Sequence, residues 1–243
     1  MRLEHFGFIH KESAKHKQLP ENLRPETCSL LVRLQQPSVF ILDPEVAMRV
    51  LDMGCGTGNP PVRARLSGSE VLIGVDIDTR SLSTAQARYP GRNFICCRAE
   101  SLPFRDASFD RVVSSVALPY TDIPTALSEI RRVLAPDGTV FMSVHHLGFT
   151  LKELRAAFPR PLAVLFRLYV IANGIIFHLT GKTLKFPNGR VESFQTRRGM
   201  TIALKRAGFE SVVHTRPDGR LIVEANANRS WPTQTALPQT ALP

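Results

Sequence analysis

The sequence VLDMGCGTGNP at residues 50–60 decides the fold of this chain. Its apolar start ends in Asp52, three glycines then alternate as G-x-G-x-G, and Asn59 and Pro60 are residue types typical of a helix start. This order predicts a β-strand, a tight loop and a helix. Because glycine has no Cβ, such a loop can take positive φ angles and lie close to a ligand, and the free N–H groups of a helix start favour a negatively charged ligand group.

At these residues the chain resembles the class I S-adenosylmethionine-dependent methyltransferases, whose first motif is an apolar strand, an acid and a GCGTG-type loop. The resemblance is close over residues 46–146 and weak over residues 192–225. It implies S-adenosylmethionine as the cofactor, and it points to the ubiquinone/menaquinone-type, small-molecule branch of the family. The later stretches that carry it are VLIGVD at 71–76, RAESLPF at 98–104, SFDRVV at 108–113 and LAPDGT at 134–139.

A dinucleotide-binding dehydrogenase is the rival interpretation, because a glycine-rich turn after a strand and a later acid also fit that fingerprint. The spacing argues against it. The loop reads G-x-G-x-G rather than G-x-G-x-x-G, and Asn59 stands where the fingerprint calls for a glycine. Methyl transfer is therefore the favoured interpretation.

Strand and helix patterns alternate from Arg49 onward, which predicts a parallel sheet with helices on both faces. Near the C-terminus, Asp218-Gly219 between two apolar runs indicates a hairpin. We expect an α/β fold: a Rossmann-like, seven-stranded, mostly parallel sheet with a helical insertion after the fifth strand. The expected organisation is an N-terminal helical or irregular segment (1–45), a methyltransferase domain (46–225) with a lid-like insertion (151–190), and a disordered tail (226–243).

The length of 243 residues suits one α/β domain with a sizeable core. The net charge of +10 is unevenly placed, because residues 151–243 hold 14 basic and 5 acidic residues. This asymmetry indicates a surface that meets anions, such as nucleic acid, a membrane or an acidic substrate. A solvated basic face without a partner is the equally weighted alternative.

The four cysteines show no C-x-x-C spacing, so the sequence predicts neither a zinc site nor a disulfide framework. The N-terminal residues lack the apolar core of a signal peptide. We therefore expect a cytoplasmic protein without a bound metal.

The apolar run LAVLFRLYVIANGIIFHL at residues 162–179 approaches the length of a membrane span. Arg167, Asn173 and His178 interrupt it, and a central arginine alone costs about 2.5–3.5 kcal/mol on insertion scales. A buried helix pair, a dimer face and a lid over the active site are the remaining interpretations, and flanking basic residues also allow peripheral contact with an anionic membrane. As a lid, the run would wall an apolar acceptor pocket with Phe166, Tyr169, Ile176 and Phe177.

The resemblance also implies cofactor contacts. Asp76 ends the second strand, and its two carboxylate oxygens can accept both ribose hydroxyls. The residue before Ala99 is usually an adenine-binding Asp in the family; here it is Arg98, which has donors only, so Glu100 or the Ala99 backbone would take its place. The predicted cofactor-binding residues are Asp52, Gly54, Cys55, Gly56, Gly58, Asn59, Asp76, Ile77, Ala99, Glu100 and Ser115.

Catalysis of methyl transfer needs alignment and exclusion of water, and a hydroxyl acceptor must also lose a proton. Histidine is the commonest general base near neutral pH. His145 and His146 follow the fifth strand at the carboxyl edge, where open α/β sheets bind ligands, and strand alternation lets at most one of them reach the pocket. With Tyr120 after the fourth strand, they are the predicted catalytic residues, although either histidine taken alone fits a surface or supporting residue slightly better.

The sequence thus predicts methyl transfer to a small, lipophilic acceptor. One alternative is an RNA or protein methyltransferase that uses the basic C-terminal part, although no recognisable RNA-binding pattern accompanies that charge. The other is a non-catalytic scaffold with a methyltransferase fold, for which Arg98 is the only support.

Overall fold

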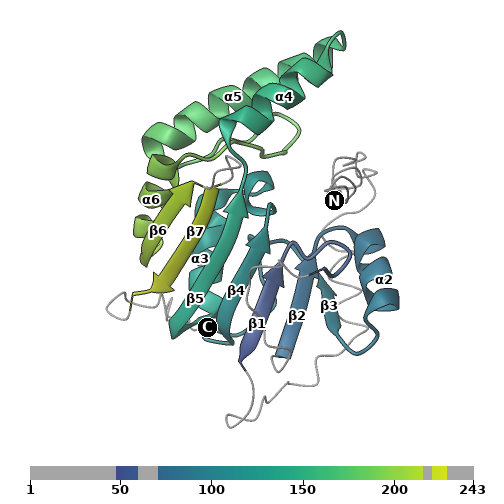
Figure 1. Cartoon of the computed structure of the whole chain (residues 1–243), viewed down its shortest axis with the longest axis vertical. Coiled ribbons are helices and arrows are strands. Elements are labelled where there is room, and N and C mark those ends of the chain that lie inside the picture. Colours follow the sequence, from purple (N-terminus) through teal and green to yellow (C-terminus); the bar gives the residue numbers. More distant parts are fainter. Residues whose placement is uncertain (1–47, 60–70, 216–220, 229–243) are drawn as a thin grey trace, which may run out of the picture. The chain divides into compact units, whose positions relative to one another are not determined.

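The computed structural model describes residues 48–59, 71–215 and 221–228. Within them, seven strands form one sheet in the order β3-β2-β1-β4-β5-β7-β6 (Figure 1). The strands are β1 (Arg49–Met53), β2 (Val71–Asp76), β3 (Asn93–Cys96), β4 (Phe109–Ser115), β5 (Leu134–Val144), β6 (Phe209–Thr215) and β7 (Leu221–Ala227).

The sheet is parallel except for one strand. β1 pairs in parallel with β2 and β4, β2 with β3, and β4 with β5, whereas β7 runs antiparallel to both β5 and β6. This confirms the predicted seven-stranded, mostly parallel sheet and its final hairpin. The Asp-Gly turn of that hairpin lies outside the described residues.

Local residues explain where α2 begins and where α5 ends. The Asp78 carboxylate accepts from the N–H groups of Arg80 and Ser81 and starts α2, as an aspartate N-cap should. Gly181, at φ +67°, ends α5. The helix expected at residues 60–67, the N-terminal segment and the tail from residue 229 lie outside the described residues. The described helices are α2 (Thr79–Arg88), α3 (Ile123–Val133), α4 (Leu147–Ala157), α5 (Pro161–Thr180), α6 (Arg197–Arg206) and the short 3₁₀ helix η1 (Leu118–Tyr120).

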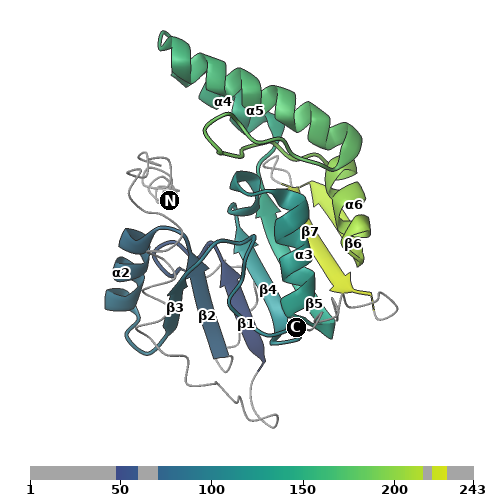
Figure 2. The same ribbon diagram turned by 180° about the vertical axis from the view of Figure 1, so that it is seen from behind.

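The core lies between the sheet and the helices on its faces. α3 buries Ile123, Leu127 and Ile130 completely, at the spacing that places them on one side of a helix. Figure 2 shows α3 and α6 on the same face of the sheet. The strand order reverses between β1 and β4, and in open α/β sheets such a reversal opens a ligand crevice at the carboxyl ends of the strands.

The predicted helical insertion follows β5. α4 and α5 pack together beyond the carboxyl end of β5 (Figure 1). The segment at residues 181–196 then returns to the sheet, where the Ser193 N–H donates to the Pro119 carbonyl (3.1 Å) and the Gln195 N–H to the His145 carbonyl (2.9 Å). The insertion is thereby fixed to the ends of β4 and β5.

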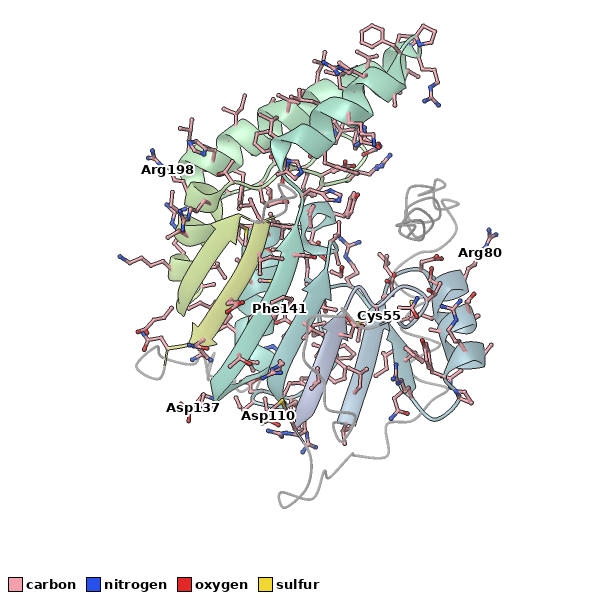
Figure 3. All side chains as sticks on the ribbon, in the orientation of Figure 1. Cys55, Arg80, Asp110, Asp137, Phe141 and Arg198 are labelled. Atoms are coloured by element: carbon pink, nitrogen blue, oxygen red, sulfur yellow. The ribbon has the colours of Figure 1, made fainter. Side chains whose placement is uncertain are left out.

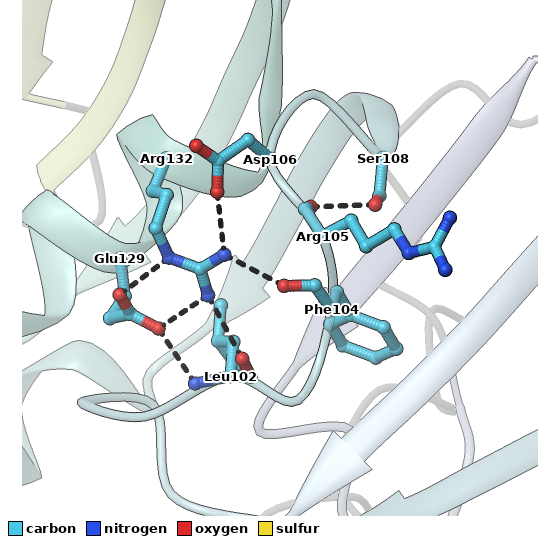
Figure 4. A network of polar contacts seen from close by, with 7 residues as sticks. All are labelled: Leu102, Phe104, Arg105, Asp106, Ser108, Glu129 and Arg132. Atoms are coloured by element: carbon cyan, nitrogen blue, oxygen red, sulfur yellow. Dashed lines mark hydrogen bonds and ion pairs between the residues drawn. The ribbon is translucent and has the colours of Figure 1, made fainter. Parts of the chain in front are cut away.

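The LPF stretch before β4 is fastened to α3 by Arg132 (Figure 4). The Arg132 guanidinium donates to both carboxylate oxygens of Glu129, to the carboxylate of Asp106 and to the backbone carbonyls of Leu102 and Phe104 at 2.7–3.0 Å. Glu129 also accepts from the Leu102 N–H at 2.8 Å. The contacts of Leu102 and Phe104 with α3 therefore hold the loop between β3 and β4 in place.

Candidate active site

The glycine-rich loop leaves the carboxyl end of β1. Gly54, Gly56 and Gly58 have φ angles of +73°, +52° and +85°, which residues with a side chain rarely adopt. A Cβ at Gly54 would lie 2.1 Å from the Ala117 Cβ, whereas no described atom lies within 4 Å of the place that a Cβ at Gly56 would take. Gly54 thus permits close packing against the start of η1, and Gly56 leaves bare backbone facing open space.

Asp76, the last residue of β2, holds this loop. One carboxylate oxygen accepts from the Gly56 N–H (2.8 Å) and the other from the Asp78 N–H (2.9 Å). The expected ribose acceptor therefore lies directly beside the open backbone of Gly56. Ile77, the next residue, is 40% exposed, so its side chain is available to a ligand.

Asp52 is buried inside β1, in register with Gly74 of β2 and Val113 of β4. Burial, and then the negative charge of Asp76, raise the pKa of Asp52 to about 7, against a smaller opposing effect of Arg92. Near neutral pH the Asp52 carboxyl group can therefore be either a donor or an acceptor.

The end of the loop is tied to α2. Asn59 Oδ1 accepts from the Tyr89 hydroxyl at 2.9 Å and from Arg88 at 3.4 Å, and the Gly58 carbonyl accepts from Arg92 at 3.4 Å. The helix that Asn59 is expected to cap lies outside the described residues. Within the described residues, Asn59 fixes the last part of the glycine-rich loop to the end of α2.

Among the described cysteines, Cys55 and Cys97 are free thiols. Burial raises the pKa of the Cys55 thiol, so it stays protonated in the loop. Figure 3 shows Cys55 at the end of the sheet toward which β1 runs and Asp110 at the opposite end. Among the described residues, no group of three or more His, Cys, Asp or Glu side chains could hold a metal ion.

The position expected to contact adenine carries an ion pair. Arg98 donates to Glu100 Oε1 at 3.4 Å, and the same oxygen accepts from the Asp122 N–H at 3.0 Å, just before α3. Glu100 therefore helps to fix the start of α3, and a contact of Glu100 or Ala99 with adenine stays a prediction.

The carboxyl end of β4 carries backbone strain. Ser115 Oγ lies 3.4 Å from Ser143 Oγ of β5. The next residue, Val116, has a φ of +64°, an uncommon conformation for a β-branched side chain. Such strain gathers at functional sites. Here it turns the chain into η1 and brings Ala117 against the glycine-rich loop.

His145 and Tyr120 meet beyond the ends of β5 and β4. Their rings contact edge to face with centroids 5.6 Å apart, and His145 stacks on Phe149 at 4.0 Å. Burial, and then the positive charges of His146 and Arg167, lower the pKa of His145 to about 4. Burial also raises the pKa of Tyr120. Both groups are therefore uncharged at neutral pH.

His146 has a structural role at the start of α4. Its Nδ1 accepts from the Gly148 N–H at 3.1 Å and caps α4. Of the three predicted catalytic residues, the structure brings His145 and Tyr120 together and engages His146 in a helix cap.

A charged cluster that the sequence analysis did not foresee borders this pair. Arg167 of α5 donates to Glu153 of α4 at 3.0 Å and to Glu192 of the returning segment. The charges of all three residues act on the pKa of Tyr120. The arginine inside an otherwise apolar run was the one sequence signal that could have pointed to it.

Of the four side chains expected to wall the acceptor pocket, Phe177 is wrong, and the other three stay a prediction. Phe166 and Tyr169 pack against Phe186, with ring centroids 5.4 and 4.8 Å apart. Phe177 is fully buried and packs so tightly on Gly199 that a Cβ there would lie 2.6 Å from the Phe177 carbonyl oxygen. The physical reason is that the segment after α5 and the start of α6 cover these aromatic side chains; Ile176 is half-buried.

One hollow lies apart from these residues. It has a volume of about 740 Å³ and opens between α5 and α6. None of the predicted site residues lines it, so it does not mark the candidate active site. Its lining residues are His178, Thr196, Arg197, Arg198, Thr201 and Ile202.

Comparison with known families gives a match on the same residues. Residues 51–142 match the family described as "Methyltransferase domain". Over residues 51–142 the chain is therefore similar to methyltransferase domains. This confirms the resemblance seen in the sequence, and the cofactor of this family is S-adenosylmethionine.

Among curated proteins, a malonyl-[acyl-carrier protein] O-methyltransferase of Erwinia pyrifoliae is 41% identical over 115 residues, which is 47% of this chain and 43% of that protein. A ubiquinone/menaquinone biosynthesis C-methyltransferase of Acidiphilium cryptum is 29% identical over 74% of each chain. The chain therefore spans less than half of the first of these relatives and about three quarters of the second.

Solved structures agree on the fold. An S-adenosylmethionine-dependent methyltransferase of Mesorhizobium loti superposes with a TM-score of 0.51 at 20% identity, over 81% of this chain and 96% of that one. The CurJ carbon methyltransferase gives 0.52 at 16% identity, over 82% and 54%. Identities this low support the shared fold alone.

Proposed function

We propose that this protein transfers a methyl group from S-adenosylmethionine to a small, apolar acceptor. The observation that carries the proposal is the bare backbone of Gly56 beside the Asp76 carboxylate, at the carboxyl edge where the strand order reverses. Relatives named for methylating malonyl-[acyl-carrier protein] and for quinone biosynthesis support a small-molecule acceptor.

The residues present fit the cofactor. A side chain at Gly56 would project into the space that the open loop leaves, and Asp76 offers two oxygens on one carboxylate, as a ribose diol requires. Gly54, Gly56, Asp76 and Ile77 would therefore hold the cofactor, which supplies a methyl group on a positively charged sulfur.

The chain's own part in the reaction is to orient the acceptor and to exclude water. His145 is uncharged at neutral pH, so its imidazole can take a proton from an acceptor hydroxyl as the hydroxyl attacks. With a pKa of about 4 it is a weak base, which suits an acidic hydroxyl such as a phenol. Tyr120 keeps its proton and can donate a hydrogen bond to the acceptor.

An apolar acceptor agrees with the surroundings of these groups. Tyr120, His145 and Phe149 present aromatic surfaces to one another, and the insertion formed by α4, α5 and the returning segment covers that side. We propose that this insertion acts as the lid, and that the enzyme works in the cytoplasm with peripheral access to a membrane.

Isothermal titration with S-adenosylmethionine tests the proposal. Wild-type protein should bind it, and transfer of its methyl group to a panel of phenols and quinols should be detectable by mass spectrometry. Folded wild-type protein that gives no binding heat would contradict the assignment and would favour the non-catalytic scaffold.

A second candidate function is methylation of RNA or protein, which the basic C-terminal part favours because residues 151–243 carry 14 basic and 5 acidic residues. RNA binding that weakens steeply with salt, together with methyl transfer to RNA, would support this alternative.

A further inference from the structure

Helix α5 presents a continuous apolar face to solvent. Its exposed apolar side chains recur every three or four residues, which places them on one side of the helix. At 1.5 Å per residue this stripe is about 26 Å long. It consists of Leu162, Leu165, Leu168, Ala172, Ile175 and Leu179; Leu162 is 81% exposed, and the other leucines and the isoleucine are at least half exposed.

Other large apolar side chains of the insertion are exposed as well. Phe158, between the two helices, is 67% exposed, and Leu147 and Leu151 of α4 are also exposed. Soluble proteins rarely expose so many large apolar side chains side by side unless something covers them.

The opposite face of α5 is anchored in the domain. Asn173 is buried, donates to the Leu184 and Glu192 carbonyls and accepts from the Leu184 N–H, and Arg167 pairs with Glu153 and Glu192. By length and composition alone α5 could cross a membrane. These contacts tie it to the fold instead, so its apolar stripe lies on the surface of the domain.

The charges around the stripe are almost all positive. Residues 147–206 hold eleven basic and two acidic residues, and both acids pair with Arg167. Within the described parts of the chain, none of the other ten basic residues of this segment forms an ion pair. Arg155 and Arg160 lie near the tip and Lys182 just after α5, all exposed. Figure 3 shows Arg198 beside the other end of the insertion.

We propose that this surface, the α5 stripe with the Phe158 tip and its basic border, docks on an anionic lipid membrane. Apolar side chains flanked by lysine and arginine are the pattern of helices that lie in the membrane interface. A second copy of this chain is disfavoured as the occupant, because it would bring the same positive border against the first. The inference goes beyond methyl transfer, since it concerns the membrane that the protein meets and does not depend on catalysis.

Vesicle sedimentation tests the proposal with the full chain. Wild-type protein should sediment with vesicles of equal parts phosphatidylglycerol and phosphatidylcholine, and little should sediment with pure phosphatidylcholine. Binding should weaken at high salt, because salt screens the attraction between the basic border and the lipid headgroups. Equal binding to both kinds of vesicle would overturn the assignment of an anionic surface.

Variants on the stripe locate the contact. Leu162→Glu with Leu165→Glu should lower the vesicle partition coefficient by roughly tenfold or more per leucine, given the apolar area that each would bury. Met48→Glu is the matched control, because Met48 is 41% exposed but lies before β1, and it should bind as wild type. Arg155→Glu with Arg160→Glu should weaken vesicle binding and make it less dependent on salt concentration. If the leucine variants do not fold, this double variant tests whether the surface contacts the membrane.

Three results would overturn the proposal. The first is a wild-type protein that binds neither vesicle. The second is a dimer in sedimentation velocity that the leucine variants dissociate, without vesicle binding. The third is RNA binding in place of vesicle binding. Titration with S-adenosylmethionine, run on the same samples, keeps a failure of cofactor binding distinct from a failure of docking.

Discussion

The backbone N–H of Gly56 donates a 2.8 Å hydrogen bond to the carboxylate of Asp76, 20 positions later in the chain. This bond joins the loop after β1 to the end of β2, on neighbouring parallel strands. It holds the Gly56 backbone, which has a φ of +52°, against the Asp76 carboxylate. The candidate cofactor site is therefore preorganised by its own acid.

Replacing Asp76 with alanine should weaken S-adenosylmethionine binding by roughly 1.5–3 kcal/mol, the scale for hydrogen bonds to a charged group. Calorimetric titration measures the loss. Asp78→Ala is the matched control, since Asp78 only caps α2 and should lose about 1 kcal/mol of stability with unchanged affinity. Equal affinity of the Asp76 variant and wild type would remove Asp76 from the site.

Valine at Gly56 should abolish cofactor binding. The residue has a φ of +52°, and its missing Cβ points into open space, so a branched side chain would strain the backbone and fill the space beside Asp76. Gly91→Ala serves as the control, because that glycine also faces open space but has no positive φ. A folded Gly56 variant that still binds the cofactor would place the ligand elsewhere.

Asp52→Asn should make the protein more stable at alkaline pH. The folded-state pKa of Asp52 is raised from 3.8 to about 7 by burial and by Asp76, so the folded state binds more protons than the unfolded state between these values. Wild-type stability should therefore fall as pH rises through this window. The asparagine variant should lack this dependence. Its free energy of unfolding minus that of wild type should therefore rise by on the order of 1–3 kcal/mol between pH 5 and pH 8. Urea unfolding at both pH values measures it; parallel curves for the two proteins would contradict it.

His145→Ala should lower turnover of a hydroxyl acceptor by about 10²-fold while cofactor affinity stays unchanged. Because the pKa of His145 is lowered to about 4, the wild-type rate should rise with pH through that value and be level near neutrality. His146→Ala is the comparison: loss of the α4 cap should reduce stability by about 1 kcal/mol and leave the rate nearly intact. A larger rate loss in the His146 variant would exchange the two roles.

Arg132→Ala should destabilise the fold by roughly 1–3 kcal/mol, because two backbone carbonyls and two carboxylates lose their donor. Burial opposes ionisation of Glu129, but its hydrogen bonds from Arg132 and the Leu102 N–H outweigh this and lower the pKa of Glu129. The stabilisation is therefore present above the unfolded-state value of 4.5 and is lost as pH falls through the lower folded value. Urea unfolding at neutral and acid pH should show a variant penalty that shrinks in acid, whereas a penalty that is the same at both would contradict the role of Glu129.

The local sequence determined the order of strand, glycine-rich loop and helix that forms the candidate cofactor site. Three glycines in five residues allow positive φ angles that other residues rarely adopt, and an acid that ends the next parallel strand must lie at the same edge as the loop. This is why Gly56 and Asp76 could both be assigned to the cofactor site before any coordinates.

Tertiary structure alone decided the acceptor side. Arg167 appeared in the sequence as an interruption of an apolar run, and its partners Glu153 and Glu192 lie 14 and 25 positions away. The same is true of the two histidines, of which one faces Tyr120 and the other caps α4. A periodic pattern reports which face of a helix is apolar, but it cannot report what covers that face. On α5, the returning segment and α6 cover one side, and the leucine stripe on the other stays exposed; that division comes from long-range packing.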